Sequence, residues 1–213
     1  MQTIEIDPKR LAKIQSLYSG SHPKNGNGHV EACAMEAVAF IAGEPWSDHP
    51  ECACPVIGAF MRAWNDGLAD DQRTSLILPL IPRLVGTRST KKIEQRRATM
   101  AADWLIRVHT PAWLRLAKLT EQADLLASLP EITDFNNCPS LMPALTAVKK
   151  DAAAAWDAAW DAAWAAARDA AWDAARDAAW DAARDAAKKA LAPTQLELQK
   201  SALKLVERMI AVD

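Results

Sequence analysis

The sequence predicts an all-α protein: a compact bundle of short helices, then a long alanine-rich tetrad-repeat helix and a short C-terminal amphipathic helix. Three observations support this. Prolines, glycines and capping residues divide the first part of the chain into short segments with apolar residues at helical spacing. Runs that alternate apolar and polar residues are missing, so strands are not expected. Residues 151–190 alone contain 22 alanines, and alanine is the strongest helix former.

The first predicted domain, residues 1–140, is the globular helical bundle. Its helices are expected to begin at a capping residue or proline and to end at a glycine or proline. Asp7-Pro8 pairs an N-cap with a proline at the first helical position, and Gly43 stops the segment 30–42. The expected helices run from Asp7 to about Gly20, over 30–42, from Pro55 to about Asp66, from Asp70 or Asp71, from Thr90, after Pro111, and over 120–130.

The second predicted domain, residues 141–213, is a tail for oligomerisation or packing. Pro143 and Pro193 bracket 49 residues without proline or glycine. As one helix this stretch would be about 73 Å long, at about 1.5 Å per residue. Thr194 and Glu197 fit a capping box that starts the last amphipathic helix.

The tail repeats in units of four residues, mostly DAAW or DAAR. Four residues turn a helix by about 400°, so each column drifts by about 40° per repeat and winds round the helix. Such a column is neither one flat face nor a heptad coiled coil. Tryptophans left in water are an apolar liability, so we expect a second subunit to cover them, with a rigid spacer as the alternative. The predicted oligomerisation residues are Trp156, Trp160, Trp164, Trp172 and Trp180.

The densest polar chemistry lies at 43–54. One histidine and two cysteines near its end resemble part of a zinc site, which a further cysteine or histidine would complete. The alternative is a capped loop, with side chains holding backbone amides and the cysteines acting as small core residues. Since no paired CxxC motif is present, no metal or other cofactor is predicted. The candidate metal ligands are Cys33, His49, Cys52 and Cys54, with His22.

Arginines and a tryptophan in the middle of the chain indicate a site for an anionic ligand. Guanidinium forks beside aromatic rings suit phosphate-bearing or nucleotide-like molecules. Solvated basic faces that pair with carboxylates are the alternative. The predicted ligand-binding residues are Arg62, Trp64, Asn65, Arg83, Arg88 and Arg107, with Asp48 and His49 from the loop.

Three blocks of the chain carry a resemblance: CAMEAVAFIAGEPWSDHPECACPVIGAFMRAWND (33–66), LPLIPRLVGT (78–87) and DWLIRVHTPAWLRLA (103–117). They resemble a family of functionally uncharacterised small proteins associated with bacteriophages, prophages and some bacteria. Members of that family often end in a similar Ala/Trp/Asp/Arg tail. The resemblance implies a phage-related origin and brings no catalytic residue with it. Serine stands at the position of Cys54 in part of the family, which argues against a zinc site through that residue.

Net charge, apolar runs and the N-terminal sequence argue against several classes of partner and location. A net charge of -2 argues against nucleic-acid binding driven by bulk charge. No apolar run is long enough for a transmembrane helix, so no membrane partner is expected. The N-terminus lacks the core of a signal peptide, so the expected location is cytoplasmic, in the host cell if the protein is phage-encoded.

These observations predict a non-enzymatic, phage-related accessory protein that acts by binding. It would be a homo-oligomer that counters host defence by capturing a host-defence protein or a small anionic, nucleotide-like signal. Two alternatives stay open. One is a structural or assembly protein whose repeat helix mediates multimerisation. The other is a metal-dependent enzyme centred on His49 and Cys52, with Glu36 nearby.

Overall fold

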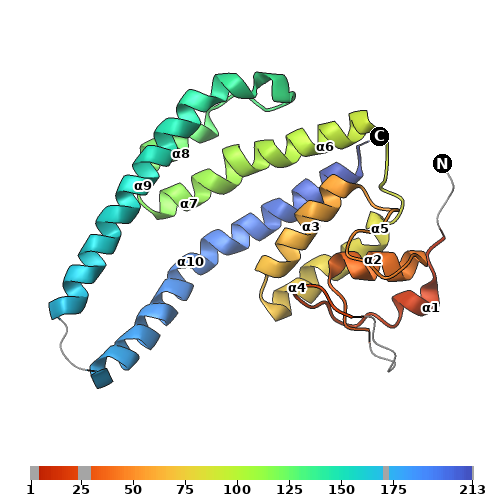
Figure 1. The fold of residues 1–213 in the computed structure, drawn as a ribbon, viewed down its shortest axis with the longest axis horizontal. Helices are drawn as coiled ribbons and strands as arrows, with labels where there is room; N and C mark the ends of the chain where they lie inside the picture. Colours follow the sequence, from red (N-terminus) through yellow and green to blue (C-terminus); the bar gives the residue numbers. More distant parts are fainter. Residues whose placement is uncertain (1–4, 24–29, 170–172, 213) are drawn as a thin grey trace. The chain divides into compact units, whose positions relative to one another are not determined.

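The computed structural model describes residues 5–23, 30–169 and 173–212, while the side chains of 137–138 and 156–186 lie outside the description. Every regular element in these ranges is a helix and none is a strand, which confirms the all-α prediction. No helix within them combines the length and apolar character that a bilayer span needs. The chain forms two compact units (Figure 1): unit 1 is Met1–Ala101 with Leu203–Asp213, and unit 2 is Ala102–Ala202. The boundary predicted at residue 140 lies inside unit 2.

Unit 1 is built from short helices around α2, which lies beside α3 and α5 (Figure 1). All of α2 is buried except Phe40 and Ala42. Its small side chains allow the neighbouring helices to approach closely, and larger residues such as Ile57 and Ile81 fill the remaining core. The helices are α1 (Pro8–Leu11), α2 (Ala34–Ala42), α3 (Pro55–Gly67), α4 (Asp70–Ile77), α5 (Ile81–Leu84) and α6 (Lys91–Trp104), with a 3-10 turn η1 (Leu78–Leu80).

The helix expected from Asp7 to Gly20 is only one turn long. Asp7 caps it as predicted, accepting hydrogen bonds from two backbone N–H groups. After α1 the chain leaves the helical path because its backbone finds partners elsewhere: the Leu17 N–H donates to Thr74 Oγ1 at 3.0 Å. Leu17 is thereby buried in the core. Tertiary hydrogen bonds thus override the helical spacing of this segment.

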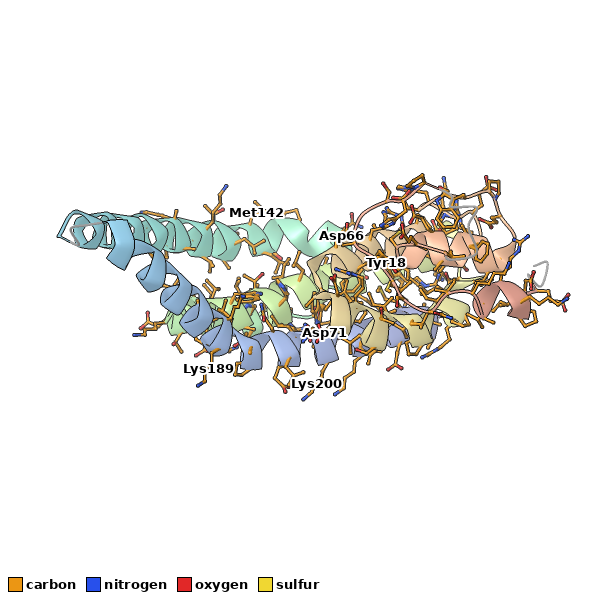
Figure 2. The ribbon with its side chains drawn as sticks, turned by 90° about the horizontal axis from the view of Figure 1, so that it is seen from below. Tyr18, Asp66, Asp71, Met142, Lys189 and Lys200 are labelled. Atoms are coloured by element: carbon orange, nitrogen blue, oxygen red, sulfur yellow. The ribbon has the colours of Figure 1, made fainter. Side chains whose placement is uncertain are left out.

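A buried amide joins this irregular segment to α2 and α3. Asn65 is fully buried; its Oδ1 accepts from the Ala34 N–H at 3.3 Å, and its Nδ2 donates to the Tyr18 carbonyl at 2.8 Å. Nδ2 also donates to Asp66 Oδ1 at 2.9 Å. Figure 2 labels Tyr18 and Asp66, which lie on the two segments that this network joins. The buried guanidinium of Arg73 donates to the Asn65 carbonyl at 2.8 Å and holds the end of α3.

A second buried guanidinium holds the C-terminus of the chain. Arg97 on α6 is 3% exposed and donates to the carbonyl groups of Thr87, Met209 and Val212 at 2.5, 2.7 and 3.0 Å. A buried charge is tolerated only when its donors are satisfied, and here backbone carbonyls satisfy them. Arg97 therefore anchors the end of α10 (Asp173–Ile210) against α6 within unit 1.

Unit 2 packs α7 against α8, and α8 against α9 (Figure 1). Its described core is the cluster of Leu114, Ala123, Leu126 and Val148. The elements of unit 2 are the π-helical turn η2 (Leu105–His109), α7 (Thr110–Leu116), α8 (Thr120–Ala127), the 3-10 turn η3 (Phe135–Asn137), α9 (Cys138–Asp169) and most of α10.

The repeat is helical over its described backbone, in α9 and α10. Two details differ from the expectation. Pro143 lies inside α9, and Pro193 lies inside α10 instead of preceding a separate last helix. Residues 190–200 stay helical around Pro193, and beyond it α10 buries Val206 and Met209 in unit 1, which offsets the hydrogen bond that proline removes. The five tryptophans predicted to mediate oligomerisation lie outside the described side chains.

Replacement of Arg97 by alanine is expected to lower the free energy of unfolding by about 3 kcal/mol, because three carbonyls lose a charged donor. Urea denaturation monitored by circular dichroism measures the change. Arg96→Ala is the matched control, since Arg96 is the exposed neighbour on the same helix, and it should change stability by less than about 0.5 kcal/mol. Equal midpoints for the two variants would contradict the anchoring role of Arg97.

Candidate functional site

The loop 43–54 connects α2 to α3, and one carboxylate closes it. Gly43 ends α2 with a φ of 78°, in the left-handed region that favours glycine. Glu44 Oε2 accepts from the Glu51 N–H and Glu44 Oε1 accepts from the Cys52 N–H, both at 2.7 Å. These two hydrogen bonds tie the start of the loop to its end and fix the orientation of the carboxylate.

The middle of the loop brings together three of the predicted ligand-binding residues. The His49 N–H donates to Ser47 Oγ at 3.0 Å, and His49 Nδ1 lies 2.6 Å from Asp48 Oδ1. Arg62 on α3 donates to the Asp48 carbonyl at 2.9 Å. The His49 side chain is 67% exposed. Asp48, His49 and Arg62 therefore form one polar group on unit 1.

The cysteines of this region belong to the core. Cys33, Cys52 and Cys54 are free and buried, whereas His49 is exposed. Burial raises the pKa of the Cys33 thiol and of the Cys52 thiol to about 12 each, and nearby carboxylates add to both shifts. Among the described residues, no three His, Cys, Asp or Glu side chains form a group that could hold a metal ion. The arrangement corresponds to the capped-loop interpretation of 43–54.

A buried carboxylate organises the segment that faces this loop. Glu36 is 2% exposed and accepts from the His22 N–H at 2.7 Å and from the Cys33 N–H at 2.8 Å. His22 Nδ1 lies 3.1 Å from the second oxygen of Glu36. The indole Nε1 of Trp46 in turn donates to the His22 carbonyl at 2.7 Å. Glu36 thus acts as a cap at the start of α2, and Trp46 is held to the segment that Glu36 positions.

The other predicted ligand-binding residues do not join Asp48, His49 and Arg62 in one site. Arg107 belongs to unit 2, where it pairs with Asp103 at 2.9 Å, and Asn65 is committed to the core of unit 1. The Nε1 atom of Trp64 is buried and has no hydrogen-bond partner among the described residues. The remaining two arginines form ion pairs: Arg83 with Glu207 at 3.1 Å, and Arg88 with Glu94 at 3.4 Å.

A pocket of about 320 Å³ opens at the start of the loop, between α1 and the end of α2. Its volume is at the lower end of the range of small-molecule sites. Two aromatic rings meet there edge to face, with the Phe40 and Trp46 centroids 6.2 Å apart. The Arg10 guanidinium lies 5.6 Å from the Phe40 centroid. The lining residues are Arg10, Phe40, Gly43, Glu44, Pro45 and Trp46.

Sequence reasoning missed this pocket because its two sides are far apart in the chain. Arg10 reaches Phe40 by donating to its carbonyl at 3.0 Å, across 30 residues. The Asp7 N–H also donates to the Ile41 carbonyl at 3.1 Å. No motif spans these positions. The aromatic and acidic residues of GEPW (43–46) were the available signal, and they lie in the polar segment predicted at 43–54, although its predicted ligand-binding residues began at Asp48.

Another histidine, His109, lies in an aromatic cluster of unit 2. Its ring centroid is 5.1 Å from that of Trp104 and 6.2 Å from that of Trp113. Trp113 Nε1 donates to His109 Nε2 at 3.1 Å, which a neutral imidazole accepts. Trp104 Nε1 donates to Ser201 Oγ at 2.6 Å, tying the cluster to α10. Burial lowers the pKa of His109, so the neutral form is the one that fits this cluster.

Comparisons with known proteins add no relationship. No protein-family model matches the chain. Neither a curated protein nor a solved structure is significantly similar to it. Function is therefore inferred from the pocket and from the polar groups around it.

Acidification is expected to destabilise unit 2 through His109. Its pKa is lowered in the folded state, so the unfolded chain binds more protons as the pH falls. The stabilising contribution is therefore complete above the ordinary pKa of about 6.5 and is lost progressively below it. Thermal unfolding of the parent and of His109→Gln, from about pH 8 to pH 5, measures the effect. The glutamine keeps an acceptor for Trp113 but should show a weaker pH dependence.

The control for this comparison is His49→Gln, which replaces an exposed histidine of unit 1. It tests whether a change in the pH dependence is specific to the histidine of the aromatic cluster. If His109→Gln and the parent lost stability in parallel as the pH fell, His109 would not be the group responsible.

Proposed function

We propose that this chain is a non-catalytic binding protein that holds a small, planar, nucleotide-like molecule in the pocket of unit 1. The observation that carries the proposal is the convergence of a guanidinium, a carboxylate and two aromatic rings on one small cavity. The lining of this half-open pocket is more polar than apolar, and a few fixed polar groups of this kind orient small ligands. The site comprises Arg10, Phe40, Glu44 and Trp46, with Asp48, His49 and Arg62 following on the same loop and on α3.

The state of the reactive groups supports binding over catalysis. A thiol with a pKa of about 12 is protonated at neutral pH and is a poor nucleophile or metal ligand, which applies to Cys33 and Cys52. Glu36, which the enzyme hypothesis includes with His49 and Cys52, already accepts from two backbone N–H groups. These groups therefore serve the fold.

The pocket also refines the hypothesis of a captured nucleotide-like signal. Asp7, Arg10 and Glu44 sum to one net negative charge at the pocket, so the uncharged ring of a nucleotide suits it better than the phosphate does. In a phage-related protein, sequestering such a molecule would deprive a host defence of its signal. This biological role rests on the sequence resemblance.

Nucleoside binding tests the proposed function directly. Calorimetric titration of the full chain with guanosine, adenosine, cytidine and uridine should detect binding of at least one of them. Stacking on an aromatic ring contributes about 1–3 kcal/mol per base, so Trp46→Ala should weaken binding roughly 10-fold or more. Trp64→Ala is the control, because it removes an indole of unit 1 that does not line the pocket. Absence of binding by the parent, or equal affinities of the two variants, would contradict the proposal.

Self-association is a second candidate function, and a specific observation favours it. Among the residues whose side chains the structure describes, most of the large apolar ones that remain exposed belong to unit 2, the unit that carries the repeat. A contiguous patch of exposed apolar side chains is typical of a surface that another subunit covers. These residues are Leu105, Val108, Leu116, Leu125, Phe135, Met142 and Leu196.

Light scattering of the full chain is expected to report more than one subunit. Replacement of the five repeat tryptophans by alanine should reduce the mass to that of one subunit, because it removes the apolar side chains while preserving helix propensity. Far-ultraviolet circular dichroism controls for retained helix. A monomeric parent would exclude the self-association, and an unchanged oligomer would assign it to other residues.

A further inference from the structure

We propose that the pocket selects a guanine base, presented as a free nucleoside or nucleotide. This inference deepens the proposed function and rests on it, because it requires the pocket to bind a small planar ligand. It derives from the hydrogen-bonding capacity left on the two charged side chains that line the cavity, and from the aromatic rings beside them.

Glu44 supplies a pair of fixed acceptors. Each of its two oxygens accepts one backbone N–H, from Glu51 or Cys52, at 2.7 Å. A carboxylate has about four lone-pair sites, so acceptor capacity remains beyond the two backbone bonds, with the Cys52 thiol beside it. The backbone bonds hold the carboxylate plane in place, which prepares it for two adjacent N–H donors. Guanine carries such a pair on one edge, at N1 and at the 2-amino group.

Arg10 supplies hydrogen-bond donors for an edge of the base that carries acceptors. Its Nη1 donates to the Phe40 carbonyl at 3.0 Å, and its Nε lies 3.4 Å from Asp7 Oδ2. Within the described chain Nη2 has no hydrogen-bond partner, so its donors are available to a ligand. Guanine offers two adjacent acceptors, O6 and N7, and arginine is the residue that most often recognises them.

The aromatic lining offers a flat surface on which one face of a base could stack. Trp46 is fixed by its hydrogen bond to the His22 carbonyl, and Phe40 meets it at an interplanar angle of 66°. Pro45 adds a further apolar surface to the lining. A base that stacks on the Trp46 indole gains stacking energy without ordering a mobile side chain, because the indole is already held.

Guanine is the base that satisfies both charged groups at once. Adenine places an amino donor beside N7, so it offers arginine one acceptor and one donor instead of two acceptors. Cytosine has a single amino donor, and uracil has a single ring N–H between two carbonyls, so neither offers the carboxylate two adjacent donors. Because the pocket carries a net negative charge, the phosphate should remain outside, and guanosine and its monophosphate should bind with similar affinity.

Calorimetric titration of the full chain with guanosine, inosine and adenosine tests the inference. Inosine lacks only the 2-amino group, so it removes one donor to Glu44 without altering the protein. Loss of one hydrogen bond to a charged group is expected to weaken binding roughly 10-fold, and adenosine should bind at least as weakly as inosine. Guanosine monophosphate should lie within roughly 3-fold of guanosine, as the phosphate makes no contact inside the pocket.

Variants assign the selectivity to the two side chains. Glu44→Gln should remove the difference in affinity between guanosine and inosine. Circular dichroism of the variant checks that it retains the fold. Arg10→Gln should weaken the binding of guanosine roughly 10-fold. Arg83→Gln, which replaces another exposed ion-paired arginine of unit 1, should leave the affinity unchanged. Binding of all nucleosides with equal affinity would overturn the guanine inference and leave the pocket as a general site, whereas no binding of any nucleoside would overturn the proposed function itself.

Discussion

Backbone hydrogen-bonding groups in the connections between short helices must find partners, and this constraint shapes unit 1. Its helices are separated by irregular segments, whose backbone N–H and carbonyl groups are not paired by the regular hydrogen bonds of a helix. Buried polar side chains take that role: Glu36 holds N–H groups, Asn65 holds both an N–H and a carbonyl group, and Arg73 and Arg97 hold carbonyls. The core of unit 1 is therefore a combination of an apolar centre around α2 and a set of buried polar side chains that hydrogen-bond to the backbone.

The same constraint decides which residues remain for function. Some side chains that could act as metal ligands or catalytic groups, such as Glu36 and Cys33, instead stabilise the fold through burial and hydrogen bonds. Glu44 differs, because it closes its loop and still lines a cavity. Because Glu44 does both, a change at this residue would affect the stability of the loop and the shape of the pocket together. Arg10 has a similar double position, since it holds α1 to α2 and faces the pocket.

The pocket is bounded on one side by an element with little packing of its own. α1 is four residues long and contains no buried residue. It is held by the hydrogen bonds from Asp7 to Ile41 and from Arg10 to Phe40. A ligand that engages Arg10 would therefore also stabilise the docking of α1, which couples occupancy of the site to local order in unit 1.

Local chemistry in the sequence determined the helical class, the cap at Asp7 and the stop at Gly43, because propensity and capping act within a few residues. Tertiary structure decided the rest. Burial of Asn65 and the encounter of Arg10 with Phe40 depend on partners about 30 residues away, and the end of the helix after Leu11 depends on Thr74. The sequence showed that residues 43–54 are polar, but it did not show which residues they contact. Those contacts depend on how the helices pack and not on spacing along the chain.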